Sequence, residues 1–228
     1  MSFQDRLEAG RRLASLLVKY KGEEVVIFAL PRGGVPVSAP IAAALGAPMD
    51  LLLVRKLGVP FQPELAMGAV ADAGTPVIVR NDDVIALAGV SEAEFEAVCK
   101  RELAEIDRRR QLYLGGRAHP DVRGRIAIVV DDGVATGATT RAALRAVRAR
   151  EPKKLVLAVP VAPPEALEIL RGEVDETVCL EVHQDFGAIG LFYADFHQIS
   201  DEEVTAILDR LGAKARAPLD GSASNAAK

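Results

Sequence analysis

The sequence has 228 residues, half of them hydrophobic, which suffices for one α/β domain with a sizeable core. Its 28 basic and 32 acidic residues leave a formal net charge of -4, which argues against a protein that mainly coats nucleic acid or an anionic membrane. No apolar run is long enough to span a bilayer, and the first residues lack the order of a secretory leader. Together with two widely separated cysteines, these features predict a cytoplasmic protein.

The first part of the chain alternates between helical and strand patterns. Apolar residues recur at helical spacing over residues 3–20, which predicts an amphipathic helix. A continuous apolar run at 24–30 is typical of a strand buried on both faces. The next predicted elements are a helix over 35–45, a strand over 49–55, a long loop rich in glycine and proline over 56–75, and a short strand over 76–80.

The rest of the chain carries clear helix-start signals. Ser91 and Glu94 predict a capping box that opens a long helix, and Ser200 and Glu203 predict another for the last helix, which ends near residue 211. Pro164 suits the first turn of a helix, because that turn does not need the amide that proline lacks. Apolar runs predict strands at 125–130, 154–161 and 177–182. Residues 213–228 are small and polar, and they are predicted to form a disordered tail.

The alternation of strands with helices predicts the fold class. It indicates an α/β fold with a doubly wound, mostly parallel sheet of about five strands, in a single domain over residues 1–212. Ligands of such sheets bind at the carboxyl ends of the strands, where the strand order reverses. Three loops leave strands at that end, after Leu30, Val54 and Val130, so one site built from these loops is expected.

The loop after Val130, in the stretch IVVDDGVATGATTRAAL, is the strongest functional signal. Small residues and threonines at 135–139 lead into a helix, and such a loop lets backbone amides, hydroxyls and the helix N-terminus contact a phosphate. Neither the P-loop nor the dinucleotide-binding glycine pattern is present. Asp131 and Asp132 would repel a phosphate unless a ribose lay between them, because carboxylates accept hydrogen bonds from vicinal hydroxyls. The stretch therefore predicts a site for a phosphorylated ribose.

An apolar strand, two acids and Thr136-Gly137-Ala138-Thr139 match, position by position, the phosphoribosyl-diphosphate (PRPP) motif of the type I phosphoribosyltransferases. The chain resembles this family over about residues 3–211, and most closely a bacterial and archaeal group of phosphoribosyltransferase-domain proteins. The segments PRGGVPV, VRKLGVPFQPELAMGAV and GLFYADFHQISDEEV carry that closer resemblance. It implies the type I fold with a small hood, built from the N-terminal helix and about residues 183–200, and a flexible lid loop at about 58–75.

The resemblance also implies an activity. It indicates transfer of a 5-phosphoribosyl group from PRPP to a nitrogen nucleophile, such as a nucleobase, with release of pyrophosphate. Mg²⁺ is implied as the cofactor, carried by PRPP near Asp131 and Asp132 without direct protein ligands, and a homodimer is implied as the assembly. The alternative is a non-catalytic regulatory protein that binds PRPP or a nucleotide on the same fold. Neither nucleic acid nor a membrane is expected as a partner.

The resemblance further assigns roles to particular residues. Arg32 and Lys56 would stabilise the departing pyrophosphate, and Asp131 and Asp132 would fix the ribose hydroxyls; these four are the predicted catalytic set. Arg32-Gly33 takes the place where the family often has a non-proline cis peptide. An ordinary surface arginine at 32 and a solvated strand end at 55–56 stay open as alternatives. The predicted PRPP-binding residues are Arg32, Gly33, Arg55, Lys56, Asp131, Asp132, Gly133, Val134, Ala135, Thr136, Gly137, Ala138 and Thr139.

The acceptor is the least specified part of the expected site. Phe186, Phe192 and Tyr193 are candidates for stacking on a base, and the alternative is that such aromatic residues belong to the core. Ala135 stands where 6-oxopurine transferases usually have an aspartate, which disfavours hypoxanthine and guanine as acceptors. Glu64 and Glu102 are candidate acid–base groups, and the alternative for each is a solvated or structural carboxylate. The sequence thus predicts the donor and leaves the acceptor and the general acid–base open.

Overall fold

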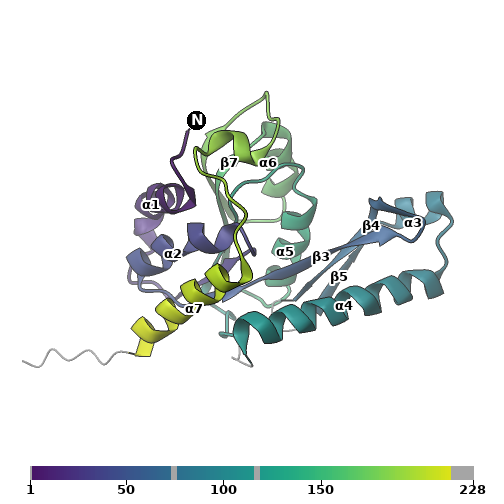
Figure 1. Ribbon diagram of the computed structural model, residues 1–228, viewed down its shortest axis with the longest axis horizontal. Coiled ribbons are helices and arrows are strands. Elements are labelled where there is room, and N and C mark those ends of the chain that lie inside the picture. The colour runs from purple at the N-terminus through teal and green to yellow at the C-terminus, as the bar shows by residue number, and fades with distance from the viewer. Residues whose placement is uncertain (1, 73–75, 116–118, 217–228) are drawn as a thin grey trace, which may run out of the picture.

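A computed structural model describes residues 2–72, 76–115 and 119–216, and a five-stranded sheet lies at its centre (Figure 1). All neighbouring strands run parallel, in the order β2-β1-β6-β7-β8. The strands are β1 (Val25–Ala29), β2 (Met49–Leu51), β6 (Ile126–Val130), β7 (Lys154–Ala162) and β8 (Glu176–Val182). β1 and β6 are buried along their whole length, as their continuous apolar runs predict. The predicted α/β class with about five parallel strands is confirmed.

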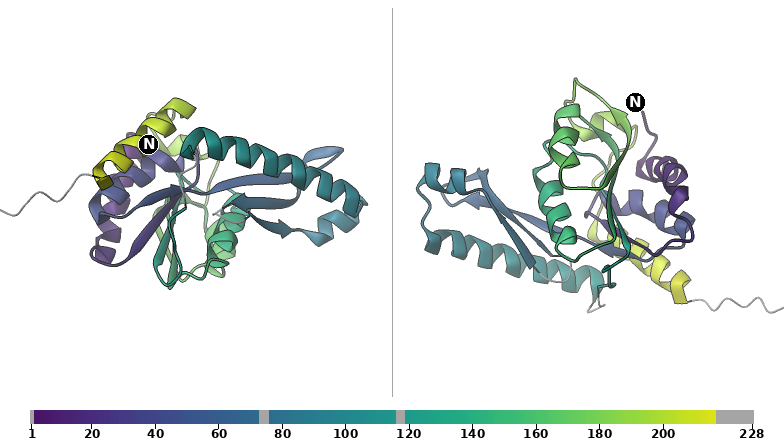
Figure 2. Two further views of the ribbon diagram at one scale, coloured as in Figure 1. Left: turned by 90° about the horizontal axis from the view of Figure 1, so that it is seen from below. Right: turned by 180° about the vertical axis from the view of Figure 1, so that it is seen from behind.

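Helices cover both faces of this sheet (Figures 1 and 2). Because successive strand residues point to opposite faces, Ile27 and Phe28 of β1 enter different apolar clusters. Ile27 packs with Leu13 and other residues of the first two helices, and Phe28 packs with Leu144 and other residues of the opposite layer. The covering helices are α1 (Arg6–Leu17) and α2 (Gly34–Leu45) on one face, and α5 (Ala138–Arg148) and α6 (Pro164–Arg171) on the other.

An arm projects from the core and consists of a second, antiparallel sheet with two helices (Figures 1 and 2). Its elements are β3 (Leu53–Val59), β4 (Gln62–Asp72), β5 (Pro76–Arg80), α3 (Asp82–Ala88) and α4 (Glu92–Leu114). The predicted strand over 49–55 is divided between the two sheets at Leu52. The predicted capping box is present at the start of α4, where Ser91 and Glu94 each accept a hydrogen bond from the other's backbone amide.

The prediction of a long loop over 56–75 is wrong, because β3 and β4 form an extended hairpin there. Gly58 and Gly68 are positions of close strand contact. A Cβ at Gly58 would lie 2.4 Å from the Pro63 carbonyl oxygen, and one at Gly68 would lie 2.5 Å from that of Val79. The pairing register also shifts at Gly58, as expected of a β-bulge. The predicted lid segment 58–75 is therefore mostly strand, and its last three residues lie outside the described residues.

A buried charge cluster joins the root of the arm to the core sheet. The His119 ring, 7% exposed, bonds through Nδ1 to the carboxylate of Asp50 in β2. Its Nε2 lies 4.0 Å from Asp72 Oδ2 at the end of β4, and the same oxygen lies 3.6 Å from Arg110 Nη1 of α4. The cluster joins β2 of the core sheet to β4 and α4 of the arm through His119.

The N-terminus and a segment near the C-terminus pack together over the carboxyl edge of the core sheet, and we refer to residues 2–6 and 189–197 as the hood segment. Phe3 forms an isolated parallel bridge with Tyr193, and Ala194 N donates to Phe3 O at 2.8 Å. The segment includes a short 3-10 helix, η2 (Ile189–Phe192), and a second one, η1 (Val18–Tyr20), follows α1. Phe3, Val161 and Tyr193 form a separate apolar cluster beneath it.

The last helix, α7 (Asp201–Arg216), starts at the predicted capping box, where Ser200 and Glu203 exchange hydrogen bonds. It runs to Arg216, so the predicted end near residue 211 and the predicted tail over 213–216 are wrong. Its acidic first turn favours the helix start. The remaining tail, 217–228, lies outside the described residues. None of the helices in the described ranges has the length and apolar character that crossing a bilayer requires.

Candidate active site

The predicted site lies where the chain leaves β1 and β6 in opposite directions, at the switch point of the sheet. β1 and β6 are neighbours, and their following loops enter helices on opposite faces. The backbones approach closely here. A Cβ at Gly34 would lie 2.6 Å from the Val130 carbonyl oxygen, and one at Gly33 would lie 2.0 Å from Asp132 Oδ2. The two glycines are thus required by contact with the acid-bearing loop.

A non-proline cis peptide is present in the loop after β1, but it joins Pro31 to Arg32. It therefore lies one bond before Arg32-Gly33, where it was predicted. The loop then turns directly into α2, whose N-terminal cap is Gly33.

The two aspartates are largely withdrawn from solvent. Asp132 is 8% exposed, and its Oδ2 accepts a hydrogen bond from Arg6 Nε at 2.8 Å. Asp131 Oδ1 accepts the Asp132 amide at 2.8 Å. Burial raises the pKa of Asp131 well above its usual range, and the neighbouring charge of Asp132 raises it further. Burial also raises the pKa of Asp132, while Arg6 acts in the opposite direction.

The loop after the acids has the properties expected of a phosphate site. Ala135, Thr136, Ala138 and Thr139 are exposed, and Gly137 begins α5 with a φ of 80° that favours glycine. No hydrogen bond of the described chain uses the amides of 135–137. In contrast, Val134 N donates to Val161 O at 2.9 Å and anchors the loop to β7. Amides without a partner among the described residues and a helix N-terminus therefore lie together, close to the acid pair.

Gly133 makes room for the hood segment. A Cβ at this position would lie 2.8 Å from Cγ2 of Ile189 and 3.1 Å from Cγ1 of Val161. A larger residue would push the hood segment away from the loop that follows β6. The glycine therefore permits direct packing between the hood segment and the candidate site.

The predicted basic residues do not converge in this structure. Arg32 Nη1 lies 3.7 Å from Asp201 Oδ1, and Lys56 Nζ lies 3.0 Å from Glu64 Oε2. Arg55 bonds to Glu102, whose side chain is 10% exposed, at 2.9 Å. Because successive strand residues alternate in direction, Arg55 and Lys56 point to opposite faces of the hairpin and cannot both contact one pyrophosphate from this strand.

The two candidate acid–base groups, Glu64 and Glu102, are the partners in two of these ion pairs. Glu102 lies on the buried face of α4 and accepts hydrogen bonds from Arg55 and Arg101. Glu64 is almost fully exposed on the hairpin and pairs with Lys56. The structural alternative for Glu102 is therefore supported by its burial and by its two arginine partners.

The aromatic candidates for the acceptor pocket differ in exposure. Tyr193 is 2% exposed, and its hydroxyl donates to Asp132 O at 2.6 Å, so its ring belongs to the core. Phe186 and Phe192 are half-buried and stack on each other with centroids 5.1 Å apart. The His183 ring lies 4.7 Å from that of Phe192. Phe186 and Phe192 thus stay available as candidates, and Tyr193 supports the acid loop.

The acid pair is the part of the site whose side chains could face Mg²⁺. Acidic oxygen atoms are the donors that Mg²⁺ prefers. However, Asp132 already pairs with Arg6, and the described residues contain no group of three or more histidine, cysteine, aspartate or glutamate side chains able to hold a metal. Asp131 and Asp132 would be the carboxylates next to an ion that arrived with a ligand.

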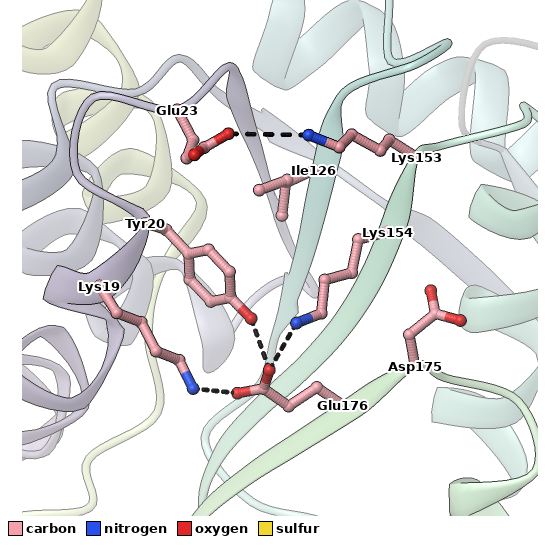
Figure 3. A pocket seen from close by; sticks show the side chains of 8 residues that line it. All are labelled: Lys19, Tyr20, Glu23, Ile126, Lys153, Lys154, Asp175 and Glu176. Carbon is pink, nitrogen blue, oxygen red and sulfur yellow. Dashed lines mark hydrogen bonds and ion pairs between the residues drawn. The ribbon is translucent and has the colours of Figure 1, made fainter.

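A pocket at the opposite edge of the sheet is closed by its own ion pairs (Figure 3). Lys19, Tyr20 and Lys154 all point toward Glu176, and the Tyr20 hydroxyl and Lys154 Nζ lie 2.6 and 2.7 Å from Glu176 Oε2. Lys153 lies 3.8 Å from Glu23 across the same pocket. Every cation of this pocket thus has an acidic partner, and we interpret the cluster as structural.

We expect Glu176→Gln to reduce the acid sensitivity of the fold. Burial opposes ionisation of Glu176, but its three donors outweigh burial and lower its pKa to about 2. The unfolded value is about 4.3, so the stabilisation is complete above that pH and is lost as pH falls through the folded pKa. With solvent screening taken into account, the free energy of unfolding of wild type should fall by roughly 1 kcal/mol more than that of the variant between the unfolded and the folded pKa of Glu176. Urea unfolding across that range measures this, with the exposed Glu168→Gln as control; equal acid slopes for wild type and Glu176→Gln would contradict it.

The position and contacts of Arg6 were not predicted from the sequence. Arg6 is 126 residues away from Asp132, so no local pattern links them. The one signal in the sequence is that Arg6 lies among apolar positions at the start of an amphipathic helix. In the structure this arginine is buried. The packing of Ile189 against Gly133 was equally unpredicted, although Gly133 itself was among the predicted PRPP-binding residues.

The structure is a parallel α/β fold whose switch point holds two adjacent acids and a loop that leads into the N-terminus of α5. The model of the phosphoribosyl transferase domain family matches residues 3–197, and the chain belongs to that family. Its five-stranded sheet and small antiparallel sheet match the type I fold of these transferases.

Two Mycobacterium tuberculosis proteins that carry phosphoribosyl transferase names, from strains CDC 1551 and H37Rv, are 48% identical to this chain over 208 residues. Each match covers 91% of this chain and 46% of the relative, so the chain spans about half the length of these curated relatives. The crystal structure of TT1426 from Thermus thermophilus is similar at 42% identity with a TM-score of 0.80. That match covers 92% of this chain and 99% of TT1426.

Proposed function

We propose that this chain transfers a 5-phosphoribosyl group from PRPP to a nitrogen nucleophile, with a nucleobase as the expected acceptor. The observation that carries the proposal is the placement of Asp131 and Asp132 shortly before a loop, 135–137, whose amides make no hydrogen bond within the described chain. Carboxylates suit the hydroxyls of a ribose, and free amides at a helix N-terminus suit its 5′-phosphate. Membership of the phosphoribosyl transferase family supports the same donor.

In the proposed reaction the bond between C1′ and pyrophosphate breaks, and the acceptor nitrogen forms a bond to C1′. Pyrophosphate leaves with the electron pair, and the proton of the nitrogen passes to solvent or to a base on the substrate. Asp131 and Asp132 hold the ribose while the loop amides hold the 5′-phosphate, which fixes C1′ relative to the acceptor. Mg²⁺ on the diphosphate supplies positive charge against the departing group.

Arg32 and Lys56 are the proposed cations for the departing pyrophosphate. Their present partners, Asp201 and Glu64, are 41% and 95% exposed, so both ion pairs are weak and readily exchanged for a phosphate. Arg55 differs, because its partner Glu102 is buried. We therefore propose Lys56, rather than Arg55, as the contact from this strand. A homodimer is part of the same proposal and is measured by light scattering.

An acceptor screen tests the enzymatic proposal. The full chain is incubated with Mg·PRPP and single nucleobases or small amines, and pyrophosphate release is followed. We expect release with one acceptor class and its loss when EDTA removes Mg²⁺. If PRPP binds and no acceptor supports release, the chain is instead a PRPP-binding regulatory protein.

A further inference from the structure

The guanidinium of Arg6 is buried between residues 196–197 of the hood segment and the acid pair. Its side chain is 8% exposed. Nε donates to Asp132 Oδ2 at 2.8 Å, and Nη1 donates to His197 O at 3.0 Å. The Phe196 ring lies beneath it, with its centroid 3.8 Å from Cζ. Because Asp5 caps the first turn of α1, Arg6 is the first residue of a rigid helix and its direction is fixed.

The hood segment contacts Asp132 at two points. Arg6 binds the carboxylate, and the Tyr193 hydroxyl donates to the main-chain oxygen at 2.6 Å. Phe3 and Tyr193 are joined by a backbone bridge, so these two contacts belong to one packed unit. No hydrogen bond or ion pair among the described residues joins Asp131 to the hood segment, and Asp131 Oδ1 accepts the next amide in the chain. The direct hydrogen bonds from the hood segment to the pair therefore go to Asp132.

We propose that Arg6 is a positioning residue of the ribose site: its ion pair holds the Asp132 carboxylate in place and makes PRPP affinity depend on packing of the hood segment. The inference rests on the proposed function, because it assigns the pair to ribose hydroxyls. Arg6 would not touch the ribose itself. It acts by placing the acceptor oxygens of Asp132 and by keeping them charged.

Charge balance explains why such a residue is needed. Asp131 and Asp132 are adjacent and withdrawn from water, so two negative charges would be costly together. In the described part of the chain, the groups that face the Asp132 side chain and main chain are Asp131, Arg6 and the neutral Tyr193 hydroxyl. Arg6 is the only cation among these described groups. Without it, one carboxyl would keep a proton to higher pH and would lose acceptor capacity for a ribose hydroxyl.

The test compares Arg6→Met, Arg6→Lys and Arg11→Met, the last an exposed arginine on the same helix with no ion pair among the described contacts. Calorimetry measures the Kd for Mg·PRPP between about pH 6 and pH 8, a range in which a raised carboxyl pKa becomes visible. For Arg6→Met we expect a Kd about tenfold weaker at the acid end and a smaller loss at the alkaline end, since one unit of pKa shift is a tenfold change. Arg6→Lys should recover most of the affinity, and Arg11→Met should match wild type.

A carboxyl carbon NMR titration of Asp132 without PRPP gives an independent readout. We expect its midpoint to move to higher pH in Arg6→Met and to stay near wild type in Arg6→Lys. An equal loss of affinity at every pH with no rescue by lysine, or an unmoved Asp132 midpoint, would overturn the proposal.

Tyr193→Phe is the variant to use if Arg6→Met does not fold, because it keeps the ring and removes one hydrogen bond to Asp132. Unchanged PRPP affinity in Tyr193→Phe would also contradict the proposal. Failure of the proposed function shows differently, as a wild type that binds no PRPP while the Asp132 midpoint still moves.

Discussion

Replacing Asp131 and Asp132 together by asparagine is expected to weaken Mg·PRPP binding by about 100-fold. Each carboxylate is proposed to accept a hydrogen bond from a ribose hydroxyl, and hydrogen bonds to charged groups contribute about 1.5–3 kcal/mol each. Asparagine keeps the shape and one acceptor oxygen, so we expect the loss to come mainly from the missing charge. Calorimetric titration of both proteins with Mg·PRPP measures the effect.

The chain contains a matched control for this double substitution. Asp82 and Asp83 form another adjacent acidic pair, in the first turn of α3, and both are exposed. Replacing them by asparagine makes the same change in net charge far from the candidate site. We expect their PRPP affinity to equal that of wild type. Equal affinities for both double variants would show that the acids at 131 and 132 do not hold the ribose.

Gly34→Ala is expected to have the largest effect on stability, at about 2–3 kcal/mol. The new Cβ would lie 2.6 Å from the Val130 carbonyl oxygen and 3.0 Å from Asp131 Cα. Both are backbone atoms of a buried strand end, and the Val130 oxygen already accepts the Leu30 amide at 2.9 Å. The strand end must therefore move, and we expect PRPP affinity to fall with the displacement of Asp131.

Urea unfolding measures the change, with Gly172→Ala as control. Gly172 ends α6 with a φ of -73°, and a Cβ there meets nothing within 4 Å. Alanine at such a position should be neutral or stabilise by about 0.5 kcal/mol, because it restricts the unfolded chain. A Gly34→Ala protein as stable as Gly172→Ala would mean that the loops after β1 and β6 are not in rigid contact.

The elements that could be predicted from sequence are those with local causes. The buried strands β1, β6 and β7 are continuous apolar runs, and the capping box at Ser91 and Glu94 depends on residues three apart. The β3–β4 hairpin was not predicted because residues 56–75 are rich in glycine and proline, which is typical of a loop. Glycine is needed at 58 and 68 because the backbone lies close to Pro63 and Val79 on paired strands. No local sequence pattern shows these contacts.

The candidate site divides in the same way. The loop at 135–139 and the acid pair form one continuous stretch, so their spacing alone predicts the ligand class. Tyr193 shows the limit: an aromatic residue near a strand end fits either a base or the core, and packing against Phe3 decides for the core. Arg6 reaches the site only through the fold, because its partner lies 126 residues later in the chain.

The central claim is that one site binds both ends of PRPP, with hydroxyls at the acid pair and phosphate at 135–139. Calorimetric titration of the wild-type chain with Mg·PRPP, ribose 5-phosphate and inorganic phosphate tests it most directly. We expect saturable binding of PRPP, weaker binding of ribose 5-phosphate at the same site, shown by competition, and the weakest binding for phosphate. PRPP that binds no more tightly than inorganic phosphate, or that ribose 5-phosphate cannot displace, would contradict the account.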